Sequence, residues 1–117
     1  MQYLLLIYAN EAESARMSPE AQGALMREYG EFTKSIVQSG HFKAGDRLRP
    51  VATATTVRVR NGKTVTSDGP FAETREQLGG YYLIEARDLD QATAIAARVP
   101  SARHGSIEVR PIWPAER

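Results

Sequence analysis

Three side chains of this sequence are the candidates for general acid–base catalysis: Asp68, His41 and Asp46. Asp68 opens the turn sequence Asp-Gly-Pro-Phe and is the first candidate for a general base or a ligand contact. Histidine titrates near neutral pH, which makes His41 a second candidate. Asp46 lies five positions further on, across Gly45, so His41 and Asp46 can face each other only if the chain bends between them.

Each of these residues also has a structural interpretation. An aspartate that precedes Gly-Pro accepts hydrogen bonds from the backbone amides just beyond it, and turn chemistry favours this role for Asp68. A histidine that follows a helix end, as His41 does, commonly interacts with that end at the surface. His104 lies in a polar loop and is a weaker candidate. Two separated histidines and no cysteine do not predict a metal site.

The candidate ligand-binding charges are Arg58, Glu73 and Arg75. Glu73 could pair with either arginine across a cleft, because a buried carboxylate needs such a partner to offset its desolvation. The same arginines could instead clamp an anionic substrate through a bidentate contact. The alternative is that Glu73, Arg75 and Glu76 form a solvated cluster of surface charges.

Two glycines and two tyrosines follow this charged loop. Gly79 and Gly80 open a predicted strand, where the close approach of another backbone, a ligand or a β-bulge would explain them. Tyr81 and Tyr82 must point to opposite faces of that strand. We expect one tyrosine in the core and the other at a dimer interface or in a binding pocket. Phe71 is expected to fill the core.

The secondary structure that must position these residues follows from hydrophobic periodicity. Strands are predicted at residues 2–8, at the start of 41–48, and at 51–60, 63–67, 80–86 and 106–112. A helix is predicted at 19–38, capped by Ser18, and a second helix after Asp88 or Asp90 that stops at Pro100. Residues 9–16 are predicted to form a loop. Asn61-Gly62 predicts a tight β-hairpin turn.

Without the hairpin, the order of elements is strand, helix, strand, strand, helix, strand. This order predicts a ferredoxin-like α+β sandwich, in which two helices cover one face of an antiparallel sheet. Because no third helix is predicted to cover the other face, we expect a homodimer whose sheets stack face to face. The domain is predicted to span residues 1–113, with a tail at 114–117.

Composition excludes several classes of function. The chain has 117 residues, a formal net charge of +1 and no cysteine, which argues against broad electrostatic capture of nucleic acid and against disulfides. The apolar start is too short, and lacks the basic flank, for a signal peptide, and no apolar run could span a bilayer. We therefore expect a cytoplasmic protein. The sequence has no glycine-rich phosphate loop, nucleophile elbow or dinucleotide fingerprint, so no cofactor is predicted.

Three segments of the sequence carry a family resemblance. The run from Asp68 through Gly80 (DGPFAETREQLGG) resembles the signature of the YCII-related, or DGPF-domain, family. Residues 54–58 (ATTVR) and 108–111 (EVRP) are further matches, so the resemblance spans nearly the whole chain. It implies a bacterial protein that forms a dimeric α+β barrel on the ferredoxin-like unit, in a family where most members have no established activity.

Two functional ideas come with that resemblance. Compact relatives have been proposed as enzymes because a histidine on the first helix faces an aspartate. This sequence has no histidine in that helix, and its nearest counterpart is Tyr29, so the dyad does not carry over. Many members of the subgroup are encoded beside extracytoplasmic-function sigma factors, which implies a regulatory role.

Two functions therefore follow as hypotheses. The first is a pocket near the dimer interface, lined by Asp68, Glu73, Arg58 and a tyrosine, that binds a small polar or anionic metabolite and could act on it by acid–base chemistry. The alternative is a non-enzymatic regulatory protein, partnered with a sigma factor through the Asp68 loop and the hairpin tip. Whether the protein is an enzyme stays open at this point.

Overall fold

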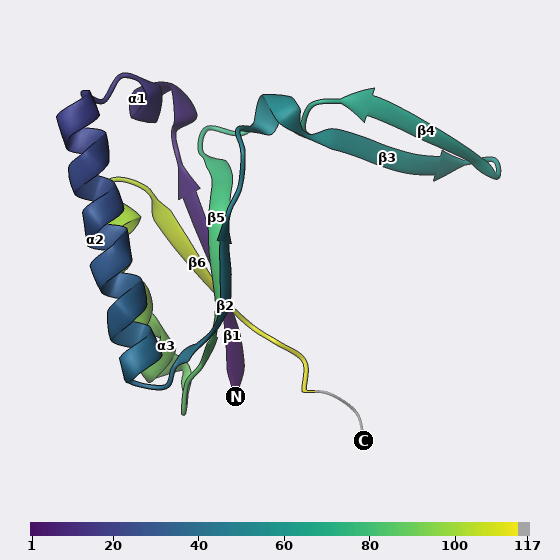
Figure 1. The fold of residues 1–117 in the computed structure, drawn as a ribbon. Helices are drawn as coiled ribbons and strands as arrows, with labels where there is room; N and C mark the ends of the chain where they lie inside the picture. Colours follow the sequence, from purple (N-terminus) through teal and green to yellow (C-terminus); the bar gives the residue numbers. More distant parts are fainter. Residues whose placement is uncertain (115–117) are drawn as a thin grey trace.

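The computed structural model describes residues 1–114, so the predicted tail lies outside the described residues except at Pro114. The elements are, in order, β1 (Gln2–Ala9), α1 (Glu11–Ala15), α2 (Pro19–Gln38), β2 (Phe42–Arg47), the 3₁₀ turn η1 (Val51–Thr53), β3 (Thr55–Arg60), β4 (Lys63–Asp68), β5 (Gln77–Glu85), α3 (Leu89–Ala96), the 3₁₀ turn η2 (Pro100–Arg103) and β6 (Ser106–Pro111). Figure 1 shows a main sheet with helices on one side and a separate hairpin.

The main sheet has four strands in the order β2-β5-β1-β6, and all its neighbouring strands are antiparallel. The two longest strands, β1 and β5, occupy its centre. Sequence order and spatial order together are compatible with the predicted ferredoxin-like arrangement. The described part of the chain is thus a mixed α+β fold with antiparallel sheets.

Helices α2 and α3 cover one face of this sheet (Figure 1). Ser18 caps α2 through a hydrogen bond from the Ala21 amide, and Asp88 caps α3 in the same way. The core between helices and sheet is apolar and closely packed. Its fully buried large side chains are Leu5, Ile36, Ile84 and Val99.

The opposite face of the sheet, here called the open face, is covered by none of the helices in residues 1–114 (Figure 1). Strand alternation places Leu4, Leu6, Tyr81 and Leu83 there, because their neighbours Leu5, Tyr82 and Ile84 point into the core. These four side chains are half-buried. The sheet therefore presents an apolar stripe on the side that its own helices leave uncovered.

Strands β3 and β4 form a separate two-stranded sheet. Their turn is the predicted Asn61-Gly62 pair, whose φ angles of 51° and 73° lie in the left-handed region that such turns require. The hairpin extends from the body on the side of the open face (Figure 1).

The predicted loop at residues 9–16 is wrong, because the short helix α1 forms there. Asn10 caps it by accepting a hydrogen bond from the Glu13 amide at 2.9 Å. The spacing of Asn10 and Glu13 matches a capping box and could have signalled the helix, but five residues are too few to show a hydrophobic period. This third helix buries no residue and leaves the open face uncovered.

Candidate functional site

Asp68 is the last residue of β4, where it pairs with Thr55 at the base of the hairpin. The turn beyond it is held by Gly69, whose amide donates to the Ala54 carbonyl at 2.7 Å and whose carbonyl accepts from the Thr56 hydroxyl at 2.9 Å. Gly69 has a φ of 93°, which glycine adopts at no steric cost. Within residues 1–114, the expected bonds from the following amides to the Asp68 carboxylate do not form, so this exposed carboxylate is open to other partners.

The structure does not bring the predicted charges together. Arg58 lies three positions from the residue that pairs with Asp68, and strand alternation therefore puts it on the opposite face of the hairpin. Glu73 and Arg75 are exposed in the loop that follows. Four ion pairs form within residues 1–114, and none of them includes Arg58, Glu73 or Arg75.

Phe71 does not fill the core as predicted, because its side chain is 80% exposed. It belongs to the loop between β4 and β5, outside the helices and strands of the described residues. The Phe71 ring is therefore available to a partner or to a second copy of the chain.

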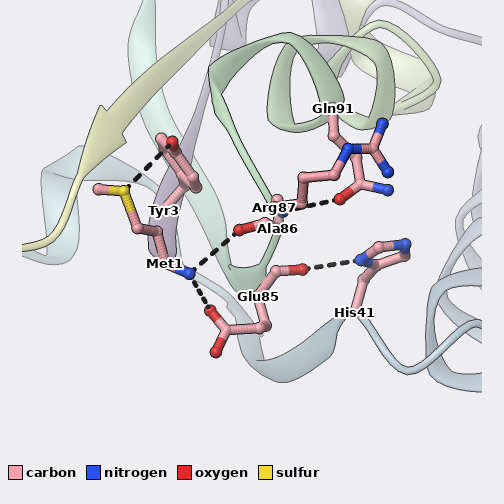
Figure 2. Close-up of polar contacts among 7 residues, drawn as sticks. All are labelled: Met1, Tyr3, His41, Glu85, Ala86, Arg87 and Gln91. Carbon is pink, nitrogen blue, oxygen red and sulfur yellow. Dashed lines mark hydrogen bonds and ion pairs between the residues drawn. The ribbon is translucent and has the colours of Figure 1, made fainter.

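His41 and Asp46 lie at opposite ends of β2, so the strand does not bend enough to let them meet. The His41 ring donates from Nδ1 to the Glu85 carbonyl at 2.7 Å, as Figure 2 shows. The Glu85 carboxylate in turn contacts the Met1 ammonium at 2.9 Å. His41 thus joins the start of β2 to the end of β5.

Asp46 contacts Tyr81 directly. The Tyr81 hydroxyl donates to Asp46 Oδ2 at 2.7 Å across the β2–β5 pair, on the open face. This hydrogen bond, together with the negative charge of Asp46, raises the pKa of Tyr81. The carboxylate therefore holds the proton on the phenol, and the pair combines a proton donor with a neighbouring base.

The substitution Asp46→Asn should lower the pKa of Tyr81 toward the ordinary tyrosine value. The reason is that the phenolate forms more readily once its anionic neighbour is gone. Ultraviolet absorbance titration of tyrosinate measures this, with Tyr81→Phe subtracted to isolate one tyrosine among five. Asp90→Asn, in the first turn of α3, is the control. Identical titration curves for the Asp46 variant and wild type would show that the pair does not form.

Tyr82 lies in the core, with 8% of its surface exposed. Its hydroxyl shares a hydrogen bond of 2.7 Å with Thr33 of α2, and its ring meets Phe32 edge-on at 5.3 Å between centroids. Tyr82 thereby fastens α2 to the sheet. Of the two tyrosines, only Tyr81 reaches the open face.

A hollow of about 230 Å³ lies at the end of β2 and is lined by Arg47, Leu48, Arg49 and Pro50. Within residues 1–114 neither arginine forms an ion pair. Two guanidinium groups without carboxylate partners favour an anion, which they can bind by paired N–H donors. Arg47 and Arg49 were not predicted as site residues, because a β2 strand that was only weakly indicated gave no reason to select them.

Glu11 of α1 connects the chain segments at the end of the sheet beside this hollow through hydrogen bonds. Its Oε2 accepts from the Val51 amide at 3.1 Å, and its own amide donates to Gln77 Oε1 at 2.9 Å. Asn10 adds a bond from its side chain to the Arg75 carbonyl at 3.2 Å. The unpredicted helix therefore fixes the segments that carry Arg49 and Arg75.

The backbone of β2 lies so close to Gly80 of β5 that only glycine fits at this position. A Cβ there would lie 2.9 Å from the Asp46 carbonyl oxygen, so any side chain would push β2 away. Gly79 forms the irregularity at which the register between β1 and β5 shifts. Close backbone approach and a bulge, the two alternatives for the glycine pair, thus both occur, one at each residue.

Tyr29, the counterpart of the relatives' helix histidine, faces Ser101 of η2. The two hydroxyls share a hydrogen bond of 2.5 Å, and burial raises the pKa of Tyr29. Next to it, Arg103 pairs with Glu28 at 2.6 Å. Tyr29 therefore packs α2 against η2, and its hydroxyl is hydrogen-bonded. Within residues 1–114 it has no carboxylate partner like the one proposed in compact relatives.

Two further observations concern metal binding and membrane-spanning helices. In residues 1–114, no group of three or more His, Cys, Asp or Glu side chains is arranged to hold a metal ion. No helix in this part of the chain is long and apolar enough to cross a membrane.

Comparison with known proteins gives two matches that cover nearly the whole chain. The model of the family described as the YCII-related domain matches residues 1–116. An uncharacterized protein of Rhizobium meliloti (strain 1021) is 39% identical over 114 residues, which is 96% of this chain and 92% of that protein. Every element described above, from β1 to β6, lies within the matched family region.

Proposed function

This chain belongs to the YCII-related family, and from that premise we propose that it binds a small polar or anionic metabolite at the end of β2, close to the interface of a homodimer. The observation that carries the proposal is the hollow with Arg47 and Arg49, two arginines that no carboxylate of residues 1–114 neutralises. A ligand carboxylate or phosphate would supply the missing negative charge.

The hollow is a shallow and open depression at the surface. About 230 Å³ is less than the roughly 300–1,000 Å³ of ordinary ligand pockets, so a second subunit would have to complete the site for a larger molecule. A dimer would also cover the open face, where Leu4, Leu6 and Leu83 form an apolar stripe. Exposed aromatic rings, 80% for Phe71 and 92% for Trp113, further favour a second copy.

Asp46 and Tyr81 are the proposed acid–base groups, because they share a hydrogen bond and Asp46 directly precedes Arg47, which lines the hollow. Asp68 is proposed as a ligand contact from the hairpin base, because its partner Thr55 follows Pro50 by only five residues. His41 is a weaker catalytic candidate, because it lies at the other end of β2.

Thermal unfolding with simple anions tests the proposal. A ligand at ten times its Kd stabilises the folded state by about 1.4 kcal/mol, enough to raise Tm by several degrees. We expect inorganic phosphate or succinate to raise the Tm of wild type above that in sodium chloride of equal ionic strength. Arg49→Gln should remove the effect, whereas Arg60→Gln, at the far end of the hairpin, should keep it. An equal rise in all three proteins, or no rise with either anion, would contradict the proposal.

A regulatory role is the second candidate, favoured by the exposed Phe71 in the loop after Asp68. In this alternative the loop and the Asn61-Gly62 tip contact a protein partner such as an extracytoplasmic-function sigma factor. Affinity purification from the native cells tests it, and Phe71→Ser should release a genuine partner. Recovery of the protein without any stoichiometric partner would count against this role.

A further inference from the structure

The β3–β4 hairpin, residues 55–68, here called the arm, lies outside the packed body. All its residues are exposed except Thr56, which is half-buried. The arm enlarges the radius of gyration to 16.3 Å, against about 13 Å for a compact chain of this length. A two-stranded hairpin on its own is only marginally stable in water, so a rigid arm needs a surface to pack on.

The two faces of the arm differ in chemistry. Val57 and Val59 share one face with the threonines that pair opposite them, and they are 59% and 62% exposed. The other face carries Arg58, Arg60 and Val65. Burying exposed valines is favourable because it removes apolar surface from water, so the first face is the one that gains from contact.

The position of the arm indicates what it contacts. It extends on the side of the open face, where the proposed second subunit would stack (Figure 1). Stacked sheets lie about 10 Å apart, whereas a strand of six residues spans about 20 Å. An arm of that length reaches past the sheet of a stacked partner and lies along its flank.

Charge favours the body of a second copy over its arm. The arm carries three of the chain's 15 basic side chains and one of its 14 acidic ones, Asp68, so its net charge is +2. The rest of the chain therefore has 12 basic against 13 acidic side chains and a net charge of −1. The body of a second copy is thus the partner of opposite net charge, whereas a second arm has the same net charge.

We propose that the arm is a dimerisation clasp, which packs its Val57 and Val59 face on the body of a second copy of this chain. This inference rests on the face-to-face dimer of the proposed function. It adds a second contact that the sheet faces alone do not supply, and it assigns the arm a partner.

Matched substitutions on the two faces of the arm test this clasp. Val57→Asp and Val59→Asp should each weaken dimerisation at least tenfold in sedimentation velocity, because each puts a carboxylate into the contact. Val65→Asp removes the same kind of strand residue from the opposite face and should change the Kd less than about threefold. Equal effects at the three positions, or no effect at Val57 and Val59, would overturn the clasp.

Removal of the arm gives a test that does not depend on the folding of the hairpin. Ala54 and Gly69 are already joined by a hydrogen bond of 2.7 Å, so a short Gly-Asn link can replace residues 55–68. We expect a folded body, with native circular dichroism, that dimerises at least tenfold more weakly. An armless protein with the wild-type Kd would overturn the clasp and leave the stacked sheets intact. Dimer loss in the arm variants but not in an open-face variant would instead support the clasp while contradicting sheet stacking.

Discussion

Replacing Gly105 by alanine is expected to destabilise the fold by about 3 kcal/mol or more. The added Cβ would lie 2.1 Å from the Tyr8 carbonyl oxygen and 3.2 Å from that of Ser101. Neither carbonyl can retreat easily, because Tyr8 belongs to the central strand β1 and Ser101 is buried. The clash is with backbone on both sides, so rotation of a side chain cannot relieve it.

Urea unfolding followed by circular dichroism measures this loss. Gly30→Ala is the matched control, because nothing lies within 4 Å of the corresponding Cβ in the middle of α2. That substitution should stabilise the protein by up to about 1 kcal/mol through helix propensity. A Gly105→Ala protein within about 1 kcal/mol of wild type would show that the junction of η2 and β6 is looser than the structure indicates.

Leu83→Asp is expected to convert the proposed dimer to a folded monomer of 12.9 kDa. Leu83 lies on the open face, in register with Leu4 of β1, where the proposed second sheet would cover it. An unpaired carboxylate in such a contact costs several kcal/mol, which corresponds to a loss of about a hundredfold or more in dimer affinity. The core is untouched, because the neighbouring side chains of Tyr82 and Ile84 are the ones that face it.

Light scattering after gel filtration gives the mass, and circular dichroism checks the fold. Lys34→Asp, exposed on α2, is the control for added charge and should remain dimeric. Ile84→Asp, which points into the core, should instead unfold the chain. Either a Leu83→Asp protein that stays dimeric or a wild type that is monomeric at micromolar concentration would contradict the stacked sheets.

Local sequence signals, such as helix caps and turn residues, made much of the fold predictable. Helix α2 spans the predicted residues 19–38, because a serine cap and a first-turn proline mark one end and Gly40, with a φ of 82°, follows the other. The hairpin turn was fixed by Asn61-Gly62. Strand β5 begins at Gln77, three residues before its predicted start, because the bulge at Gly79 lets Leu78 pair with Tyr8. Periodicity within one strand cannot show such pairing.

The candidate site was less predictable, because the sequence groups residues by position and the fold groups them by strand register. Asp46 and Tyr81 were both named as candidates, yet nothing in the sequence indicated that β2 and β5 would pair them. Arg58 and Asp68 are close in the family motifs but lie on opposite faces of the hairpin. The hollow with Arg47 and Arg49 depends on the path of the chain after β2, which no short motif encodes.

Native mass spectrometry of the protein, purified gently from its own cells, tests most directly whether the arginine hollow is a metabolite site. We expect a dimer that carries a reproducible small anionic adduct, and we expect Arg47→Gln/Arg49→Gln to lose that adduct while remaining dimeric. A wild-type dimer without any adduct, or an adduct that the double variant retains, would contradict the proposed site.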